Sequence, residues 1–445
     1  MSRILLIFLS IQTMAAACTT ALQKRFRIMT DNAPAYNILM YSHDTYGLGH
    51  IRRTMAIANH LRDRNTNILI LTGSPLAGRF SFPSQVDFVR IPGMIKKTND
   101  GYRSLSIRID DEQALSIRTN IILATAQAFK PDLLIVDKEP LGLKREVLPT
   151  LQWLKDSESK TRIILGLRDI LDDPEVIKQD WHDKNVYRHL VALYDEIWIY
   201  GDKTIYNPVD LYEIPDEMHD KIIFTGYIPR SRKSGRIREK IRSQFRIMPD
   251  DKFVLVTTGG GGDGFEVLEH YISMHEYFPA SLPFKTIMIT GPFMPKKKRG
   301  RIRKRAKQYG IKTLPFHPRL EELMQAADMI ISMGGYNTVC EILTQKTPAL
   351  IIPRETPRKE QLIRAQCLQS RNLIDFIPWN DVTPQLLRQK MISVLNGTSE
   401  AAEKRANFKL TGLDTMHTRL EYFKSERYRA QAALTEETLL PVAEQ

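Results

Sequence analysis

The stretch NILMYSHDTYGLGH, residues 37–50, decides the fold class of this chain. Its first residues form a short apolar run, its glycines mark a turn, and residues 51–61 then repeat apolar side chains at helical spacing. A second apolar run, Asn67–Leu71, completes a strand–helix–strand unit. Buried strands that alternate with helices are typical of parallel sheets. The chain is therefore predicted to be an α/β protein.

The same alternation continues along the chain and restarts once, after a polar segment, Pro229–Gly235, that is typical of a linker. A chain of 445 residues also exceeds what one core usually supports. We therefore predict two doubly wound, Rossmann-type domains with a cleft between them. The predicted parts are an N-terminal extension 1–36, a first domain 37–228, a linker 229–236, a second domain 237–398 and a helical segment 399–445 with a loose tail. The predicted strands are Asn37–Ser42, Asn67–Leu71, Asp87–Ile91, Leu133–Asp137, Ile163–Leu167, Glu196–Tyr200, Ile222–Phe224, Phe253–Thr258, Thr286–Thr290, Ile311–Leu314, Met329–Ser332, Ala349–Ile352 and Leu373–Ile377.

Composition narrows the class of partner. The formal net charge of +13 favours anionic partners, which leaves nucleic acid, an anionic membrane surface and phosphorylated small molecules. Three widely spaced cysteines exclude a disulfide framework and a Cys-rich zinc site.

The loop between the first strand and its helix contains Gly47 and Gly49 and ends at His50. Glycines let the backbone approach a ligand, and a helix beginning near His50 directs N–H groups at an anion. A histidine at a helix N-terminus tends to stay neutral, which suits a general base. His43 and Asp44 are weaker candidates for that role. The alternative is a tight turn that binds no ligand.

A second glycine loop, Thr257–Gly264, follows the first strand of the second domain and includes Gly260, Gly261 and Gly262. No Lys-Ser or Lys-Thr pair follows, so the loop is not a Walker A motif. We interpret it as a phosphate-cradling loop, with a flexible hinge as the alternative.

Two further segments follow strands of the second domain. In Met333–Glu341, Thr338 and Glu341 share the helix face opposite the buried one, so Glu341 is predicted near the cleft, where a carboxylate can accept both hydroxyls of a ribose. Pro353–Gln361 offers polar side chains to a sugar. Each segment alone could be a solvated loop.

In order and spacing these motifs resemble glycosyltransferase family 28, which includes the bacterial transferase that adds N-acetylglucosamine to lipid-linked muramyl peptide. Gly47-Leu-Gly49-His50 is similar to the family's Gly-Gly-His loop but has Leu48 in place of glycine, and Gly259–Gly264 is similar to its second glycine loop. Gly335-Tyr-Asn-Thr338-Val-Cys-Glu341 fits the Gly-x-x-Thr-x-x-Glu nucleotide-binding segment in full. The resemblance implies that Glu341 holds the ribose and that Glu360-Gln361 contacts the donor sugar. It also implies a GT-B-like fold, an inverting outcome and a hexosyl group from a UDP-linked sugar.

Candidate acceptor-side carboxylates follow two strands of the first domain, Asp137 and Glu139 after one and Asp169, beside Arg168, after the next. Either Asp137 or Glu139 could replace His50 as the base that deprotonates an acceptor hydroxyl. The alternative is that these are surface loops with ordinary charges.

Basic residues gather in two runs. Nine of the twelve residues from Lys296 to Lys307 are basic, and a second cluster spans Arg230–Arg246. A solvated helix face is the default interpretation, and an anionic membrane surface is the next, which would suit a lipid-linked acceptor. Nucleic acid is disfavoured because aromatic residues are scarce in these runs.

Together these observations predict a hexosyltransferase that moves sugar from a nucleotide-diphosphate donor to an unidentified acceptor hydroxyl. We expect no resident cofactor and no required metal. A UDP-sugar epimerase of the same fold and a non-enzymatic protein that binds anionic surfaces are the alternatives. Nucleotide substrates favour the cytoplasm, with the inner face of the membrane as a further location. They also favour a domain start near Met29 over a secretory leader in residues 1–28.

Overall fold

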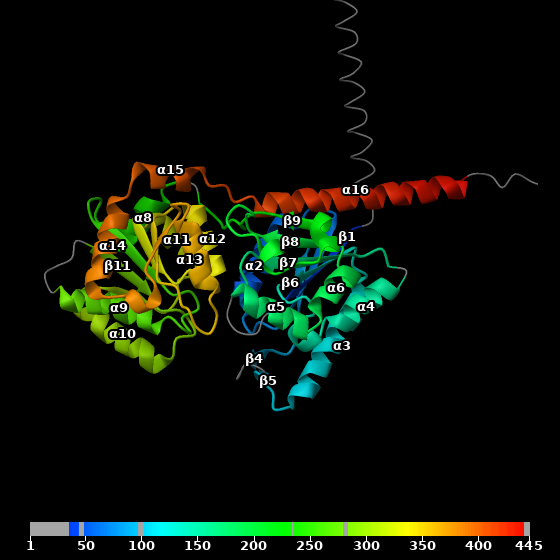
Figure 1. Ribbon diagram of the computed structural model, residues 1–445, viewed down its shortest axis with the longest axis horizontal. Helices are drawn as coiled ribbons and strands as arrows, with labels where there is room; N and C mark the ends of the chain where they lie inside the picture. The colour runs from blue at the N-terminus through cyan, green and yellow to red at the C-terminus, as the bar shows by residue number, and fades with distance from the viewer. Residues whose placement is uncertain are drawn as a thin grey trace, which may run out of the picture.

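The computed structural model describes residues 35–43, 49–96, 102–157, 159–233, 235–278 and 284–439. The predictions for residues 1–34, including the leader and the start near Met29, lie outside the described residues. Within the described part the chain forms two sheets of parallel strands that lie side by side, each covered by helices (Figure 1). The predicted α/β class with two Rossmann-like sheets is confirmed.

The first sheet has seven parallel strands in the order β3-β2-β1-β6-β7-β8-β9. The order reverses at β1 and β6, which places the carboxyl ends of both strands at the crevice where ligands of open α/β sheets bind. Its strands are β1 (Tyr36–Ser42), β2 (Thr66–Thr72), β3 (Val86–Arg90), β6 (Leu133–Asp137), β7 (Arg162–Arg168), β8 (Glu196–Tyr200) and β9 (Ile222–Phe224).

The second sheet repeats this design with six parallel strands in the order β12-β11-β10-β13-β14-β15. Its strands are β10 (Lys252–Thr257), β11 (Phe284–Ile289), β12 (Lys312–Leu314), β13 (Met329–Ser332), β14 (Ala349–Ile351) and β15 (Asp375–Phe376). Every predicted strand coincides with an observed one. The antiparallel pair β4 (Met94–Lys96) and β5 (Tyr102–Ser104) was not predicted, because three-residue strands leave no apolar run to find.

The helices fill the connections between the strands, as the spacing of apolar residues predicts. Those of the first sheet are α2 (Gly49–Leu61), α3 (Asp111–Phe129), α4 (Leu148–Asp156), α5 (Pro174–Asp183), α6 (Val186–Leu193) and α7 (Pro208–Leu211). Those that follow are α8 (Ile237–Gln244), α9 (Phe265–Tyr277), α10 (Lys296–Gln308), α11 (Leu320–Ala326), α12 (Tyr336–Gln345), α13 (Glu360–Gln369), α14 (Pro384–Asn396), α15 (Ser399–Asn407) and α16 (Gly412–Leu439).

The last helix crosses back from the second sheet to the first (Figure 1). Met416, Leu420 and Phe423 of α16 are buried at i, i+4 and i+7 spacing, each stabilising the contact by about 1.5–3 kcal/mol. Lys424 pairs with Asp63, and further ion pairs join the helix to the first sheet: Arg419 with Glu196 and Arg427 with Asp132. The two halves are therefore tied together beyond the linker. None of the helices in the described part is both long and apolar enough to span a membrane.

Candidate active site between the two sheets

A cavity of about 670 Å³ lies between the sheets, beyond the carboxyl ends of their central strands. The first sheet contributes the start of α2, residues 76–80 and Arg168 at the end of β7. The second sheet contributes the glycine loop 258–263, the loops after β11 and β12, and the starts of α12 and α13. The motifs therefore meet at one place, as the topology of two such sheets requires.

A histidine–aspartate pair stands on the first-sheet side. Nδ1 of His50, on the first turn of α2, lies 2.5 Å from Oδ2 of Asp137 at the end of β6. Arg53, one turn further along α2, donates from its Nη2 to both carboxylate oxygens of Asp137, at 2.6 and 2.8 Å. Because Nδ1 is engaged by Asp137, Nε2 is the ring atom left to accept a proton. His50 itself lines the cavity.

The charges of this pair fix its protonation. Burial lowers the pKa of His50 to about 4, although Asp137 opposes the shift. Burial raises the pKa of Asp137, but Arg53 and His50 outweigh burial and hold that pKa well below its usual range. At neutral pH the pair is therefore a neutral imidazole beside a carboxylate, which is the state a general base needs. A carboxylate that binds protons so weakly is a poor base, so Asp137 is placed to orient His50 rather than to replace it.

Glu139 lies apart from this pair. Lys138, in a left-handed backbone conformation with φ of 70°, turns the chain after β6 and pairs with Glu139 at 2.5 Å. Burial raises the pKa of Glu139, but Lys138 and His43 outweigh it and lower that pKa. Glu139 is not among the cavity-lining residues. His43 is buried, and its ring centroid lies 5.6 Å from that of His50. Gly47 and Asp44 lie outside the described residues, and Gly49 lines the cavity.

The glycine loop of the second sheet is compact because it packs on the loop after β11. Gly261 has φ of 82°, and a Cβ there would lie 2.1 Å from the carbonyl oxygen of Thr290. A Cβ on Gly260 would lie 3.2 Å from the ring of Phe293. Gly260, Gly261 and Gly262 all line the cavity. The loop therefore brings bare backbone to the cavity wall, which is how backbone N–H groups reach a phosphate.

The helix α12 begins at the cavity without a side-chain cap and without an acidic residue in its first turn. Gly335 and Thr338 line the cavity, so the N-terminal N–H groups of this helix face it. Glu341, one turn later, is 1% exposed, and its Oε1 forms an ion pair with Nη2 of Arg52 at 3.0 Å that does not have hydrogen-bond geometry. Burial raises the pKa of Glu341, while Arg52 and Arg230 lower it. Arg52 balances the charge of Glu341, and a carboxylate can accept several hydrogen bonds, so Glu341 can also accept from a ligand hydroxyl in the cavity.

Glu360 and Gln361 open α13 at the opposite edge of the cavity. Arg354 donates to Glu360 at 2.9 Å, and its backbone N–H donates to Gln361 at 3.2 Å. Oε2 of Glu360 is buried without a hydrogen-bond partner among the described residues. Both predicted residues thus reach the cavity, already positioned by Arg354.

Aromatic and apolar side chains cover part of both walls. The second-sheet side contributes Phe293, Phe316 and Pro318, and the first-sheet side contributes Leu76 and Phe80. Phe316 is 52% exposed, which is unusual for a phenylalanine and places its ring at the cavity mouth. Such faces suit stacking of a flat ring.

Sequence reasoning missed the residues that join the two halves at this site. Arg52 of α2 lies 2.6 Å from Glu321 and 3.0 Å from Glu341, both in the second half. Asn337 of α12 donates to the carbonyl oxygen of Gly49 and accepts from Arg230. Arg52 and Arg53 follow His50 by two and three residues, but arginines on a helix are common, and no local spacing marks these two as site residues.

Asp169, a predicted acceptor-side carboxylate, is buried in the contact between the halves. It pairs with Arg364 of α13 at 2.9 Å and accepts from the hydroxyl of Tyr227 at 2.8 Å. Both members of the ion pair are at most 1% exposed. Asp169 is therefore committed to a structural contact and is not placed to deprotonate an acceptor.

The two basic runs differ. In the Arg230–Arg246 cluster, Arg230 is bound to Asn337 and Arg242 is buried against Asp328 and three backbone carbonyls. The expectation of a solvated face is therefore wrong for these two arginines. On α10 six exposed basic residues form no ion pair with the described residues: Lys296, Lys297, Lys298, Arg303, Lys304 and Lys307.

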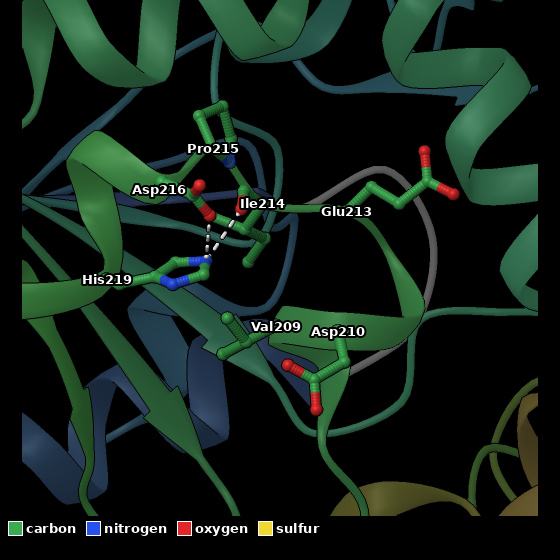
Figure 2. Close-up of a pocket in the computed structure, with 7 residues that line it drawn as sticks. All are labelled: Val209, Asp210, Glu213, Ile214, Pro215, Asp216 and His219. Atoms are coloured by element: carbon green, nitrogen blue, oxygen red, sulfur yellow. Dashed lines mark hydrogen bonds and ion pairs between the residues drawn. The ribbon is translucent and has the colours of Figure 1, made fainter.

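A second hollow, of about 410 Å³, opens on the first half around Val209, Glu213 and His219. Nε2 of His219 lies 2.9 Å from the carbonyl oxygen of Ile214 and 3.6 Å from Asp216 (Figure 2). It contains none of the predicted site residues. Among the described residues there is no group of three or more His, Cys, Asp or Glu side chains that could hold a metal ion.

Comparison with solved structures identifies the arrangement as the two-domain fold of GT-B glycosyltransferases. The MurG protein of Acinetobacter baumannii superposes with a TM-score of 0.57 at 12% identity, covering 87% of this chain and all of that one. UGT2 of Phytolacca americana, solved with UDP-2-fluoro-glucose and pterostilbene, gives 0.59 at 13% identity, covering 88% of this chain and all of that one. A UDP-GlcNAc 2-epimerase from Neisseria meningitidis gives 0.55 at 14% identity and covers 88% of this chain and all of that one, so fold alone does not separate transferase from epimerase.

Residues 253–420 match the family model of the glycosyltransferase family 28 C-terminal domain. The curated relatives are UDP-N-acetylglucosamine–N-acetylmuramyl-(pentapeptide) pyrophosphoryl-undecaprenol N-acetylglucosamine transferases. The protein of Shouchella clausii is 31% identical over 18% of this chain, and that of Acetivibrio thermocellus is 24% identical over 45%. The chain spans only 23% and 54% of the lengths of these relatives. The predicted resemblance to family 28 is confirmed, and it resides mainly in the second half.

Proposed function

We propose that this protein is a glycosyltransferase that moves a hexosyl group from a UDP-linked sugar to an acceptor hydroxyl. The observation that carries the proposal is one cavity with an oriented neutral histidine on one wall, and a bare-backbone loop with a buried glutamate on the other. The match of residues 253–420 to the family 28 C-terminal domain supports the transferase over the epimerase.

The donor would lie against the second half. Glu341 lines the cavity and would accept the ribose hydroxyls while Arg52 balances its charge. The diphosphate would lie against the glycine loop and the uncapped start of α12, where N–H groups and the helix dipole favour an anion. Phe316 at the mouth offers a face for the base, and Glu360 with Gln361 offers acceptors and donors to the sugar.

The chemistry would be a single displacement with His50 as base. Nε2 of His50 takes the proton from the acceptor hydroxyl as its oxygen bonds to the anomeric carbon, and the bond from that carbon to the diphosphate oxygen breaks. Asp137 stabilises the imidazolium that forms, and backbone N–H groups stabilise the negative charge that leaves with the diphosphate. A single displacement inverts the anomeric configuration. This step needs no metal and no resident cofactor.

For the acceptor we propose a chemical class and not a particular molecule. The relatives are transferases whose names specify an undecaprenol-linked acceptor, so a lipid-linked hydroxyl is the acceptor to test first. The unpaired basic face of α10 would suit anionic lipid, which would place the protein at the inner face of the cytoplasmic membrane.

Calorimetry of UDP binding tests the donor half, with ADP and GDP as controls. Micromolar, UDP-selective binding is the expected result, and no binding of any nucleotide would refute the proposal. Incubation with UDP-N-acetylglucosamine alone separates the transferase from the epimerase, because only an epimerase would convert the sugar without an acceptor.

A further inference from the structure

Five arginines line the cavity, and they differ in how their charge is balanced. Arg52 pairs with Glu321 and Glu341, Arg53 with Asp137, and Arg354 with Asp263 and Glu360. Arg79 is exposed, where water can solvate its charge. Arg168 is the exception, because it is partly buried and forms no ion pair and no side-chain hydrogen bond with any described residue.

The surroundings of Arg168 make this lack of a partner costly. Its Nε is buried without a hydrogen-bond partner among the described residues, a state that native proteins avoid. Three charges of its own sign, Arg53, Arg364 and Arg358, lower its pKa. Burial, and after it Arg53, lowers the pKa of Arg168 to about 10. The side chain nevertheless remains charged at neutral pH.

Glu360 is the carboxylate that raises the pKa of Arg168 most, and it is already held by Arg354 at 2.9 Å. No ion pair within 4 Å joins Arg168 to Glu360 or to any other described carboxylate. The charge of Arg168 is therefore left for something that the chain itself does not supply.

The position of Arg168 shows where that missing group would lie. Arg168 ends β7, and the neighbouring strand β6 ends at Asp137, which orients His50. A group bound by Arg168 would therefore lie beside the proposed base, within the same cavity. Arginine binds phosphate well because its planar fork of N–H donors matches two phosphate oxygens.

We propose that Arg168 binds a phosphate group in this cavity, either the diphosphate of the donor or a phosphate carried by the acceptor. This inference rests on the proposed function for its two sources, and it adds the residue and the ligand chemistry. If the acceptor is the source, the acceptor belongs to the class of phosphorylated molecules rather than neutral alcohols.

Two titrations separate the sources, each on the wild-type chain and on Arg168→Gln. If Arg168 holds the donor diphosphate, the substitution weakens UDP binding by about tenfold or more and leaves uridine binding unchanged. If it holds an acceptor phosphate, UDP binding is unchanged. In that case inorganic pyrophosphate binds to the UDP-saturated wild type and binds at least tenfold more weakly to the variant. Arg168→Lys, which keeps the charge but loses the fork, should recover part of whichever affinity is lost.

Arg303→Gln on the exposed face of α10 is the matched control for a lost positive charge. The inference would be overturned if Arg168→Gln and Arg303→Gln lost equal affinity for UDP or pyrophosphate. It would also be overturned if Arg168→Gln bound both ligands as tightly as the wild type. The melting temperature of Arg168→Gln should equal or exceed that of the wild type, because a crowded charge is removed. A fall of several degrees would assign Arg168 to structure instead. If the wild type binds no UDP, the proposed function fails, and Arg168-dependent binding of pyrophosphate to the free protein would still support the inference.

Discussion

The two walls of the cavity are built from different parts of the chain. The wall from the second sheet presents backbone: a glycine loop packed on the carbonyl of Thr290 and the uncapped start of α12. The wall from the first sheet presents charged side chains from the ends of separate strands and from α2, with His50 held by Asp137 and Asp137 held by Arg53. The second-sheet wall adds Glu341, Arg354 and Glu360 to this backbone, whereas the first-sheet wall depends on ion pairs between residues far apart in the sequence.

This difference explains where similarity to known proteins is found. Backbone-based binding of a phosphate needs short motifs at fixed spacing. The match to the family 28 domain covers residues 253–420, which include the glycine loop and the start of α12. Side-chain constellations can change with the acceptor while the sheet stays the same.

Replacing His50 should give the largest effect, and it tests the side-chain wall. His50→Ala should lower turnover by about 10²–10⁴-fold while UDP affinity stays unchanged. Because burial lowers the pKa of His50 to about 4, the wild-type rate should be constant from pH 8 to about 5 and fall below about pH 4, where the imidazole becomes protonated. UDP release measured across this pH range checks both statements. Equal losses of turnover and UDP affinity would make His50 a binding residue.

Removing Asp169 should give the next largest effect, because it breaks the contact between the walls. Asp169→Ala leaves Arg364 buried without its partner and should lower the free energy of unfolding by about 3–5 kcal/mol, measured by urea denaturation. Lys359→Ala is the matched control, since Lys359 also pairs across the halves, with Asp173 at 3.0 Å, but its side chain is 57% exposed. That control should cost less than about 1 kcal/mol. Similar losses in both variants would show that burial does not set the strength of this contact.

The same contrast between walls sets what the sequence could predict. Every long strand and the helix over 51–61 followed from apolar spacing, because burial in a parallel sheet leaves a local signal. A local signal also marked the predicted donor-side residues, because each lies in a short motif directly after a strand: Gly260, Gly261, Gly262, Thr338 and Glu341. How these residues act on a ligand remains a prediction.

The other wall was not predictable in this way. Asp137 lies 84 residues from Arg53 in the sequence, and Asp169 lies 195 residues from Arg364. No local sequence pattern therefore predicts either ion pair. The sequence named Asp137, Glu139 and Asp169 as alternative bases because each follows a strand. Only the fold shows that each already has a cationic partner.

Glu341 tests the backbone wall, and the expected effect is smaller. Glu341→Ala should weaken UDP binding by about 1–3 kcal/mol, because the ribose hydroxyls lose their acceptor. Glu321→Ala is the control, since Glu321 is the other partner of Arg52 but does not line the cavity. Calorimetry should find the affinity of the control within about twofold of the wild type. Unchanged affinity in Glu341→Ala, with the fold intact, would remove the ribose from this position.

The smallest effect is expected outside both walls, on the basic face of α10. Lys297 is exposed and pairs with no described carboxylate, so near an anionic bilayer it should contribute about 1 kcal/mol, or roughly fivefold in partitioning. Sedimentation with phosphatidylglycerol vesicles should show this loss for Lys297→Ala, while Lys203→Ala, an exposed lysine of the first half, should leave partitioning unchanged. Because the attraction is electrostatic, the difference should also shrink as salt is raised. Equal partitioning of both variants at low salt would separate the charge of α10 from membrane binding, and the proposal of a lipid-linked acceptor would then lose its support from this surface.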